Sequence, residues 1–514
     1  MTTFISENKK FAIFFILIIA FFLRVYRLGY HDFWYDEAWT VNYAKYPWEN
    51  WNAPLYWIIL HFWTKLFGFS EFSLRSPSLI FSLLSVTLTF LLGKRLFNKK
   101  VGILASLFIG FSPFHLWYAQ EARDYSMVLF LGTLSSYLFF KATKEERLKL
   151  WLSFVLVSML GLYTNYFYIF LLISQGLYFV LLRRWRLNFK EIICFLVIAL
   201  GFIPYLNRFL TKFYYVWGGF WIPKPSLKSL IITIENFILG YNASSHLYLI
   251  SDLLLSLFFI CAVLNFKKKE LRESLIFCLL LFIFPILAVF IFSKLFFPIY
   301  IDRGLIIFSP YYYLLLGLGI DYLGDKQLKK IILSAFLVIL LISLSSYYRN
   351  LMPAEPGHHI GVVLKKPYKP ALRFIENNFK LGDIIMHTNS SSQEVFEFYS
   401  RNKEITQDFL FASKMIDPNW DRPYESGVGI VSVEELASIN AKRIWVVSCD
   451  WQRGKELDKN SKAVNSEMSK LYKLDLSLEF DGLWVYRYLK LYPRGIQLVM
   501  FSMEELLIIY EYFA

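Results

Sequence analysis

Two adjacent carboxylates, Asp36 and Glu37, are the residues in the chain best suited to catalysis, and they directly follow its first apolar run. Trp34, Tyr35 and Trp39 surround them, and such aromatic residues are typical of the membrane–water boundary. Partial desolvation there favours the neutral form of a carboxyl group and strengthens it as a base when it is ionised. The pattern predicts a general base. An acidic surface loop anchored by aromatic residues is the alternative interpretation.

A second polar cluster is the segment SPFHLWYAQEARDY, residues 112–125. Its Glu121 and Asp124 are three residues apart, so they would share a face at the start of a helix. Arg123 and His115 add hydrogen-bond donors suited to an anionic group. Taken alone, these residues fit a substrate site and a salt-bridged outer turn about equally well.

Two single arginines, Arg75 and Arg303, stand at the edges of apolar segments. Arg303 could bind an anionic group, pair with the adjacent Asp302 or extend to lipid headgroups, and Arg75 has similar choices. The sequence contains no zinc-ligand spacing and no phosphate-cradling glycine loop. The two arginines are therefore candidates for holding an anionic substrate.

The composition shows what kind of protein must position these residues. The 514 residues are 56% hydrophobic, 20% aromatic and 18% charged, whereas soluble proteins carry about 25% charged residues. The mean hydropathy is +0.44. These values exclude a cytosolic enzyme, a disordered protein and a fibrous protein, and four scattered cysteines exclude a disulfide scaffold. A membrane protein fits.

Apolar windows of the length that crosses a bilayer, about 20 residues, occur about eleven times. The predicted spans are 11–30, 77–96, 102–119, 125–141, 150–165, 166–183, 190–211, 247–265, 272–294, 303–323 and 329–347, a count good to about one. A further apolar stretch at 54–68 is too short to span and is predicted to lie at the interface.

The basic residues predict an orientation. The net charge is +14, and Lys and Arg gather in alternate connections, whereas the other connections are longer, aromatic and poor in Lys. The positive-inside rule places the basic connections and the N-terminus, with Lys9 and Lys10, in the cytoplasm. An odd number of spans then puts everything after residue 348 outside, and the acidic and arginine clusters fall on this outer side.

The fold class predicted is an α-helical polytopic membrane protein with a small extracytoplasmic α/β domain. Residues 1–349 form the transmembrane domain, residues 350–490 the outer domain and residues 491–514 a C-terminal tail. Within the outer domain, hydrophobic patterns predict a helix at 369–378 and strands at 383–387, 443–447 and 483–489.

Carboxylates and arginines at headgroup depth suit a reaction on a lipid phosphate. Cationic side chains would hold the phosphate, and an acid would handle the proton of a hydroxyl group. A transporter or lipid flippase is the main alternative, but such proteins usually place charges near the bilayer midplane and show repeated halves, and neither feature is visible here. A scaffold that only presents the outer domain would leave the clustering unexplained.

Four sequence stretches resemble the GT-C glycosyltransferases. The likeness is to the prokaryotic branch of the protein O-mannosyltransferase superfamily, which includes the lipid A aminoarabinose transferases. It covers roughly residues 10–350, and its most specific part is the run Gln120 to Arg123 with Ser112 and Pro113 upstream. The stretches are WYDEA at 34–38, APLY at 53–56, EFSLRSP at 71–77 and residues 112–125, with Asp302 and Arg303 as a weaker match.

The resemblance implies an inverting transfer of a sugar from a polyprenyl-phosphate lipid to a hydroxyl or amine of an acceptor outside the cytoplasm. Asp36 matches the family's general base, and Glu37 lies beside it. Arg75, Arg123 and Arg303 match positions that face the donor phosphate or organise the outer site.

For the remaining polar residues, the resemblance implies contacts with substrate. Glu121 is expected to contact the acceptor or the sugar, and His115 and Tyr118 belong to the predicted substrate site. The expected partners are the bilayer, the lipid donor and a protein, glycan or lipid acceptor, without nucleic acid. No nucleotide, cofactor or metal is expected.

Two positions depart from the family pattern. Asn52 and Ala53 stand where a basic residue and a proline are frequent, and Asn165 stands where a histidine is common. Contacts to phosphate or acceptor should not be carried over through these positions.

Overall fold

The computed structural model describes residues 9–48, 52–183, 189–400, 407–411, 430–432, 441–449, 457 and 459–490. These residues divide into two compact units, one reaching Tyr368 and the other beginning at Lys369. The segment 350–368 is thus grouped with the helical unit, whereas the outer domain is predicted to start at residue 350. The predicted tail at 491–514 lies outside the described residues.

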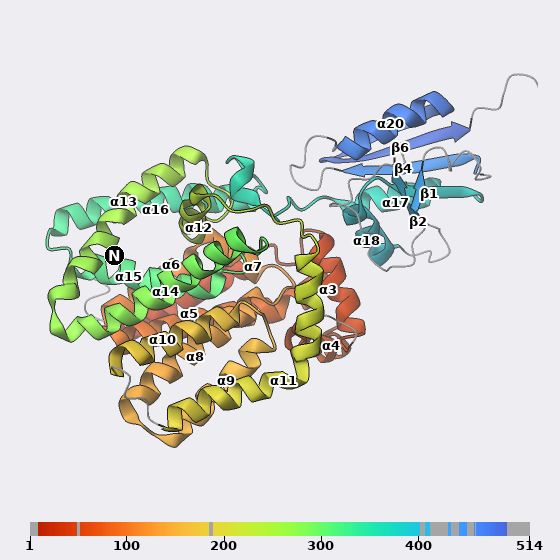
Figure 1. Ribbon diagram of the computed structural model, residues 1–514. Helices are drawn as coiled ribbons and strands as arrows, with labels where there is room; N and C mark the ends of the chain where they lie inside the picture. The colour runs from red at the N-terminus through yellow and green to blue at the C-terminus, as the bar shows by residue number, and fades with distance from the viewer. Residues whose placement is uncertain are drawn as a thin grey trace, which may run out of the picture. The chain divides into compact units, whose positions relative to one another are not determined.

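The first unit is built from helices (Figure 1). Neighbouring long helices pack side by side, for example α5 with α8, α8 with α9 and α10 with α14, while α3 and α4 lie together at one end. The α-helices are α2 (Lys9–Val25), α3 (Tyr35–Lys45), α4 (Leu55–Phe67), α5 (Glu71–Leu96), α6 (Lys99–Phe111), α7 (Pro113–Ala119), α8 (Tyr125–Glu145), α9 (Leu148–Leu162), α10 (Tyr168–Arg183), α11 (Phe189–Trp217), α12 (Leu227–Leu239), α13 (Ser245–Leu264), α14 (Lys269–Leu295), α15 (Ser309–Tyr322) and α16 (Lys326–Tyr348). The 3-10 helices are η1 (Asn265–Lys267), η2 (Ile306–Phe308) and η3 (Pro356–His359).

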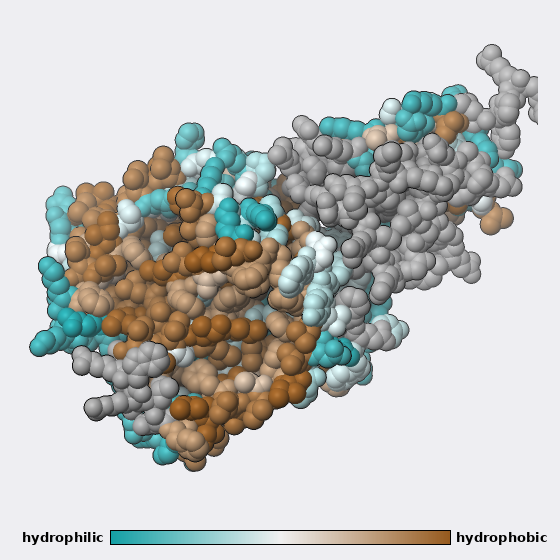
Figure 2. All heavy atoms as spheres, viewed as in Figure 1, coloured by the Kyte–Doolittle hydropathy of each residue, from teal (hydrophilic) through white to brown (hydrophobic). Residues whose placement is uncertain are grey.

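This unit makes the chain a multi-pass membrane protein. Among the described residues, six helices are long and apolar enough to cross a bilayer, and the bent pair α6–α7 would make a seventh. Apolar side chains face outward on these helices, as Leu200 (61% exposed) and Ile203 (56% exposed) do on α11. Figure 2 shows hydrophobic residues across the visible face of the helical unit and hydrophilic residues towards its ends.

A helix overlies each of the eleven predicted spans. The apolar helices Phe11–Val25, α9 and α10 are shorter than the crossing length, and the span predicted at 303–323 contains η2 and the short helix α15. The apolar stretch at 54–68 forms α4. The predicted number of crossings and their orientation remain predictions.

The span predicted at 102–119 is broken between α6 and α7, which meet at an angle of 60°. Ser112 has extended backbone torsions (φ −57°, ψ 125°) because a residue before proline avoids the helical region. Pro113 then starts α7 at a position where its missing N–H costs no hydrogen bond. The break turns α7 and the polar segment 120–124 away from the axis of α6.

The second unit is the predicted α/β domain. Its core contains Ile444, Val446, Val464 and Met468. Among the described residues, β1 (Asp383–His387), β2 (Gln407–Phe411), β3 (Ile430–Ser432), β4 (Arg443–Cys449), β5 (Tyr472–Phe480) and β6 (Leu483–Lys490) form one sheet in the order β3-β2-β1-β4-β6-β5, with α17 (Tyr368–Asn378), α18 (Ser390–Tyr399) and α20 (Lys459–Leu471). The strands β1, β2, β3 and β4 are parallel, and β6 runs antiparallel to β4 and β5. The helix and three strands expected from the sequence are all present.

Candidate active site

Glu37 forms a two-pronged ion pair with Arg75. The Nε and Nη2 atoms of Arg75 lie 2.7 and 2.8 Å from the two carboxylate oxygens, and both side chains are buried. The backbone N–H of Ala122 donates a further hydrogen bond of 2.9 Å to Glu37 Oε1. Burial raises the pKa of Glu37, but the opposing charge and hydrogen bonds of Arg75 hold that pKa below its ordinary value.

Arg75 also fixes the chain that leads into α3. Its remaining N–H groups donate to the backbone carbonyls of Leu28, His31 and Asp32 at 2.8 to 3.1 Å. All five donors of the guanidinium thus contribute to the loop or to Glu37. The pair therefore holds the loop, the start of α3 and the turn at Ala122 together.

Asp36 faces two other arginines. Its Oδ2 atom lies 3.1 Å from Arg303 Nη1 and 3.9 Å from Arg123 Nη2. Unlike Glu37, Asp36 keeps some exposure: its side chain is 19% exposed, and those of Arg303 and Arg123 are 11% and 16% exposed. Both carboxylates lie in the first turn of α3, where the helix dipole stabilises negative charge.

The two arginines are themselves held in place. Arg123 Nη1 donates to the backbone carbonyl of Asp36 at 3.2 Å, and Arg303 Nη1 donates to the carbonyl of Gly361 at 2.8 Å. The aromatic ring of Tyr125 lies within 6 Å of both guanidinium groups, at 5.7 Å from Arg123 and 5.9 Å from Arg303. Three chain segments that are far apart in sequence thus meet at one carboxylate.

Arg303 does not pair with its neighbour Asp302, which was one of the alternatives left by the sequence. The carboxylate of Asp302 instead accepts hydrogen bonds of 2.6 and 2.7 Å from Thr233 and Asn236 of α12. Asp302 therefore fixes the loop before η2 onto α12, and Arg303 is left to face Asp36.

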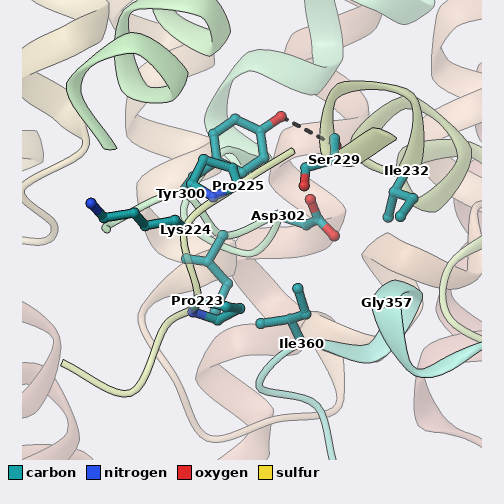
Figure 3. Close-up of a pocket in the computed structure, with 10 residues that line it drawn as sticks. Pro223, Lys224, Pro225, Ser229, Ile232, Tyr300, Asp302, Gly357 and Ile360 are labelled. Carbon is teal, nitrogen blue, oxygen red and sulfur yellow. Dashed lines mark hydrogen bonds between the residues drawn. The ribbon is translucent and has the colours of Figure 1, made fainter. Parts of the chain in front are cut away.

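Asp302 also lines a small pocket (Figure 3). The pocket lies between the loop before α12, the loop before η2 and the segment that includes η3. Its lining residues are Pro223, Lys224, Pro225, Ser229, Ile232, Tyr300, Ile301, Asp302, Gly357 and Ile360. Both carboxylate oxygens of Asp302 already accept hydrogen bonds from α12.

Glu121 is buried next to Ala122, whose N–H donates to Glu37. The Oε1 atom of Glu121 accepts a hydrogen bond of 2.5 Å from Trp117 Nε1, whereas Oε2 has no hydrogen-bond partner among the described residues. The nearby cation is Lys365, whose Nζ donates to the backbone carbonyl of Gln120 at 3.1 Å. Burial raises the pKa of Glu121 to about 7 although the charge of Lys365 lowers it, and burial lowers the pKa of Lys365 to about 8.

The raised pKa of Glu121 leads to a stability prediction. The folded protein holds this proton more tightly than the unfolded chain, whose carboxyl group titrates near the ordinary value of 4.5. The stabilisation of the fold by protonated Glu121 is complete below pH 4.5 and is lost as the pH rises through about 7. We therefore expect Glu121→Gln to raise the melting temperature relative to the natural protein at about pH 8 and to have a smaller effect at about pH 5. Thermal melts of the two proteins at both pH values check this. A difference in melting temperature that is the same at both pH values, as expected for the control Glu467→Gln, whose side chain is 41% exposed, would contradict it.

Two predicted site residues lie further from Asp36. His115 is buried in the helical core, where its Nε2 atom lies 3.1 Å from the hydroxyl of Tyr313 and 3.0 Å from that of Ser309. Tyr118 is also buried, and its hydroxyl is hydrogen-bonded to Tyr241 at 2.6 Å. Its ring packs edge-on against Tyr125, so Tyr118 supports the ring that flanks the arginines.

Glu121 and Asp124 lie before α8 rather than on a helix. The carboxylate of Asp124 accepts a hydrogen bond of 2.8 Å from Asn165 Nδ2. The asparagine that departs from the family pattern therefore has a structural partner in this chain. Sequence reasoning missed Lys365 and the carbonyl of Gly361 altogether, and neither stands in a recognisable motif.

Comparison with solved structures identifies the fold. ArnT from Cupriavidus metallidurans, both in the apo state and bound to undecaprenyl phosphate, superposes with a TM-score of 0.59. The match covers 94% of this chain and 98% of ArnT at 10% sequence identity. At that identity the likeness shows the fold, which is the GT-C fold predicted from the sequence.

Comparison with protein families gives a match to part of the chain. Residues 52–207 match the family described as dolichyl-phosphate-mannose-protein mannosyltransferase. The match includes Arg75 and the segment 112–125, while Asp36 and Arg303 lie outside it. An uncharacterised protein of Aquifex aeolicus (strain VF5) is 26% identical over 410 residues, which are 74% of this chain and 79% of that protein. The predicted resemblance is confirmed to this extent: part of the chain matches a glycosyltransferase family, and the chain has the GT-C fold.

Proposed function

We propose that this glycosyltransferase moves a sugar from a polyprenyl-phosphate lipid to a hydroxyl or amine of an acceptor outside the cytoplasm, with Asp36 as the general base. One observation carries the proposal: the carboxylate of Asp36 lies beside the guanidinium groups of both Arg303 and Arg123. A proton acceptor and two anion-binding groups are therefore within one side-chain length of each other. This combination is what an attack on a sugar phosphate requires.

The proposed reaction is a single displacement with inversion. The acceptor oxygen or nitrogen attacks the anomeric carbon from the side opposite the phosphate. The bond between that carbon and the phosphate oxygen breaks, and the polyprenyl phosphate leaves with the bonding electrons. The carboxylate of Asp36 takes the proton released by the acceptor, and the arginines stabilise the charge that grows on the phosphate.

Before donor binds, Arg303 is shared between Asp36 and the carbonyl of Gly361. A donor phosphate would compete with Asp36 for this guanidinium. The ring of Trp221 lies 5.5 Å from Arg303, and with Tyr125 it limits the orientations that the planar group can take. Phosphate binding would therefore free the Asp36 carboxylate for the acceptor.

Glu37 and Arg75 have a different part in this proposal. Both are buried and satisfied by each other, so they organise the loop that carries Asp36 and do not contact the phosphate. Glu121, which has one carboxylate oxygen without a partner among the described residues, is the acid available for a sugar or acceptor hydroxyl.

The comparisons support a lipid-linked donor. The ArnT structure of the same fold was obtained with undecaprenyl phosphate, and the matching family is named for a dolichyl-phosphate sugar. The positive-inside pattern supports placing the site on the outer side. The reaction as proposed needs no nucleotide, metal or other cofactor, because the leaving group is already attached to the sugar and arginines neutralise its charge.

Replacement of Arg303 tests the phosphate contact. We expect Arg303→Ala to weaken binding of undecaprenyl phosphate at least about tenfold, and Arg303→Lys to weaken it less because lysine keeps the charge but loses the planar fork. Titration of the purified protein with undecaprenyl phosphate, followed by native mass spectrometry, measures both. The exposed outer arginine Arg349 provides the matched control, Arg349→Ala. Equal affinity of the Arg303→Ala and natural proteins would refute the contact.

A further inference from the structure

Arg24 is a fully buried arginine whose described partners include no carboxylate. It lies in the last turn of α2 and is 0% exposed. Its Nη1 and Nη2 atoms donate to the carbonyls of Gly110 and Ile109 at 2.8 and 3.2 Å, and Nε donates to Ser82 at 2.8 Å. The two carbonyls belong to the last turn of α6, next to the break at Ser112.

These carbonyls need a partner because of the break. A continuing helix would bond the Ile109 carbonyl to the N–H of residue 113, which is proline and has none. The charge of Arg24 also complements the negative end of the α6 dipole. Arg24 therefore takes the place of the helix turn that Pro113 removes.

Gln120 does the same for α2 from the other side. Its Nε2 atom donates to the carbonyls of Arg24 and Tyr26, both at 2.8 Å, at the end of α2. Its Oε1 atom accepts a hydrogen bond of 2.6 Å from the hydroxyl of Tyr347. Gln120 is 4% exposed, so these bonds are shielded from water. The end of α2 thus caps α6, and the turn after α7 caps the end of α2.

The capped segments are the ones that lead to the two halves of the site. The end of α2 runs through the loop held by Arg75 into α3, which carries Asp36. Gln120 begins the turn that carries Arg123. The spacing between the end of α2 and this turn therefore sets where Asp36 and Arg123 lie relative to each other.

We propose that Arg24 and Gln120 are positioning residues that form one clamp, and that the clamp holds Asp36 and Arg123 in the geometry needed for transfer. The inference rests on the proposed function, because it concerns the placement of the proposed base. Misplacement of a catalytic group by about 1 Å can cost about a hundredfold in rate. The clamp thus acts on turnover and not only on folding.

The test is a double-mutant cycle on turnover per folded molecule. Purified variants receive lipid-linked sugars together with acceptor material, both extracted from the source cells, and released polyprenyl phosphate is quantified. We expect Arg24→Met and Gln120→Met each to lower kcat at least about tenfold, with KM for the lipid changed less than about twofold. Because one clamp is broken in either case, the double variant should be no slower than the slower single variant.

A milder variant keeps the test decisive if the methionine variants fold poorly. Tyr347→Phe removes only the hydroxyl that donates to Gln120, and we expect it to lower kcat several-fold. A natural kcat for Tyr347→Phe, or a lower melting temperature with unchanged kcat for the methionine variants, would show that the contacts only support the fold. Multiplying effects in the double variant would show two independent contacts and would also overturn the clamp.

Asp36→Asn in the same assay separates this proposal from the proposed function. If Asp36→Asn loses activity while the clamp variants keep it, only the clamp is wrong. If Asp36→Asn is fully active, the proposed function itself fails.

Discussion

Asp36→Asn should lower turnover at least about 10²-fold, the smallest loss expected when a general base is removed. Asparagine keeps the size of the side chain and can still accept a hydrogen bond from Arg303, but it cannot take a proton from the acceptor. Binding of the lipid donor should not weaken, because the amide leaves Arg303 and Arg123 in place and competes less with the phosphate for Arg303. The measurement is the rate at which polyprenyl phosphate is released from the lipid-linked donor, together with donor affinity.

Two controls define this experiment. Glu145→Gln, which neutralises an acid at the opposite end of α8, should retain the natural rate. Asp36→Glu keeps a base but moves its carboxylate by one methylene group, so it should retain more activity than Asp36→Asn. Full activity of Asp36→Asn would contradict the assignment of the base.

Arg75→Met should give the largest loss of stability in the helical unit. It would leave the Glu37 carboxylate buried without its partner, and removing one member of a buried ion pair costs about 3–5 kcal/mol. It would also free the loop carbonyls that Arg75 binds. Thermal and chemical denaturation of the detergent-solubilised protein measures the effect.

The double variant Arg75→Met/Glu37→Met identifies the cause. Since it removes both charges, it should recover part of the stability lost in Arg75→Met. The pH dependence gives a second check. The lowered pKa of Glu37 means that the pair stabilises the fold above the ordinary value of 4.5 and ceases to do so as the pH falls through the folded-state pKa. The deficit of Arg75→Met should therefore shrink in acid, and a deficit independent of pH would mean that the ion pair is not its origin.

Much of the fold follows from the sequence because bilayer thickness and hydrophobic patterning are strong constraints. Every apolar window coincides with a helix, and the four elements expected in the outer domain are present. The break of the span at 102–119 was missed although its signal, Ser112 followed by Pro113, is explicit. A window of mean hydropathy averages over such a break.

The sequence also located the candidate site, but not its internal pairing. Asp36 and Glu37 are adjacent, and successive residues on a helix point about 100° apart. One therefore enters the protein core towards Arg75, while the other faces Arg303 and Arg123. Which carboxylate meets which arginine depends on how α3 rotates against the turn at Ala122, and local spacing contains no information on that rotation.

Local sequence patterns could not predict the site residues that lie at the end of the helical unit. Lys365 and Gly361 lie in a segment without helical or strand periodicity, which the sequence analysis placed in the outer domain. Their importance arises from tertiary contacts with Gln120 and Arg303. Conversely, His115 has suitable chemistry but lies in the helical core, since its neighbours in α7 are apolar and buried.

The most direct test of the account is mass spectrometry of the lipid that co-purifies with the natural protein and with Asp36→Asn. The account predicts a polyprenyl phosphate in both, free of sugar in the active protein and carrying the sugar in Asp36→Asn, which binds the donor but does not consume it. A polyprenyl phosphate with the same sugar occupancy in both proteins, or the absence of any such lipid from both, would contradict the central role of Asp36 between Arg303 and Arg123.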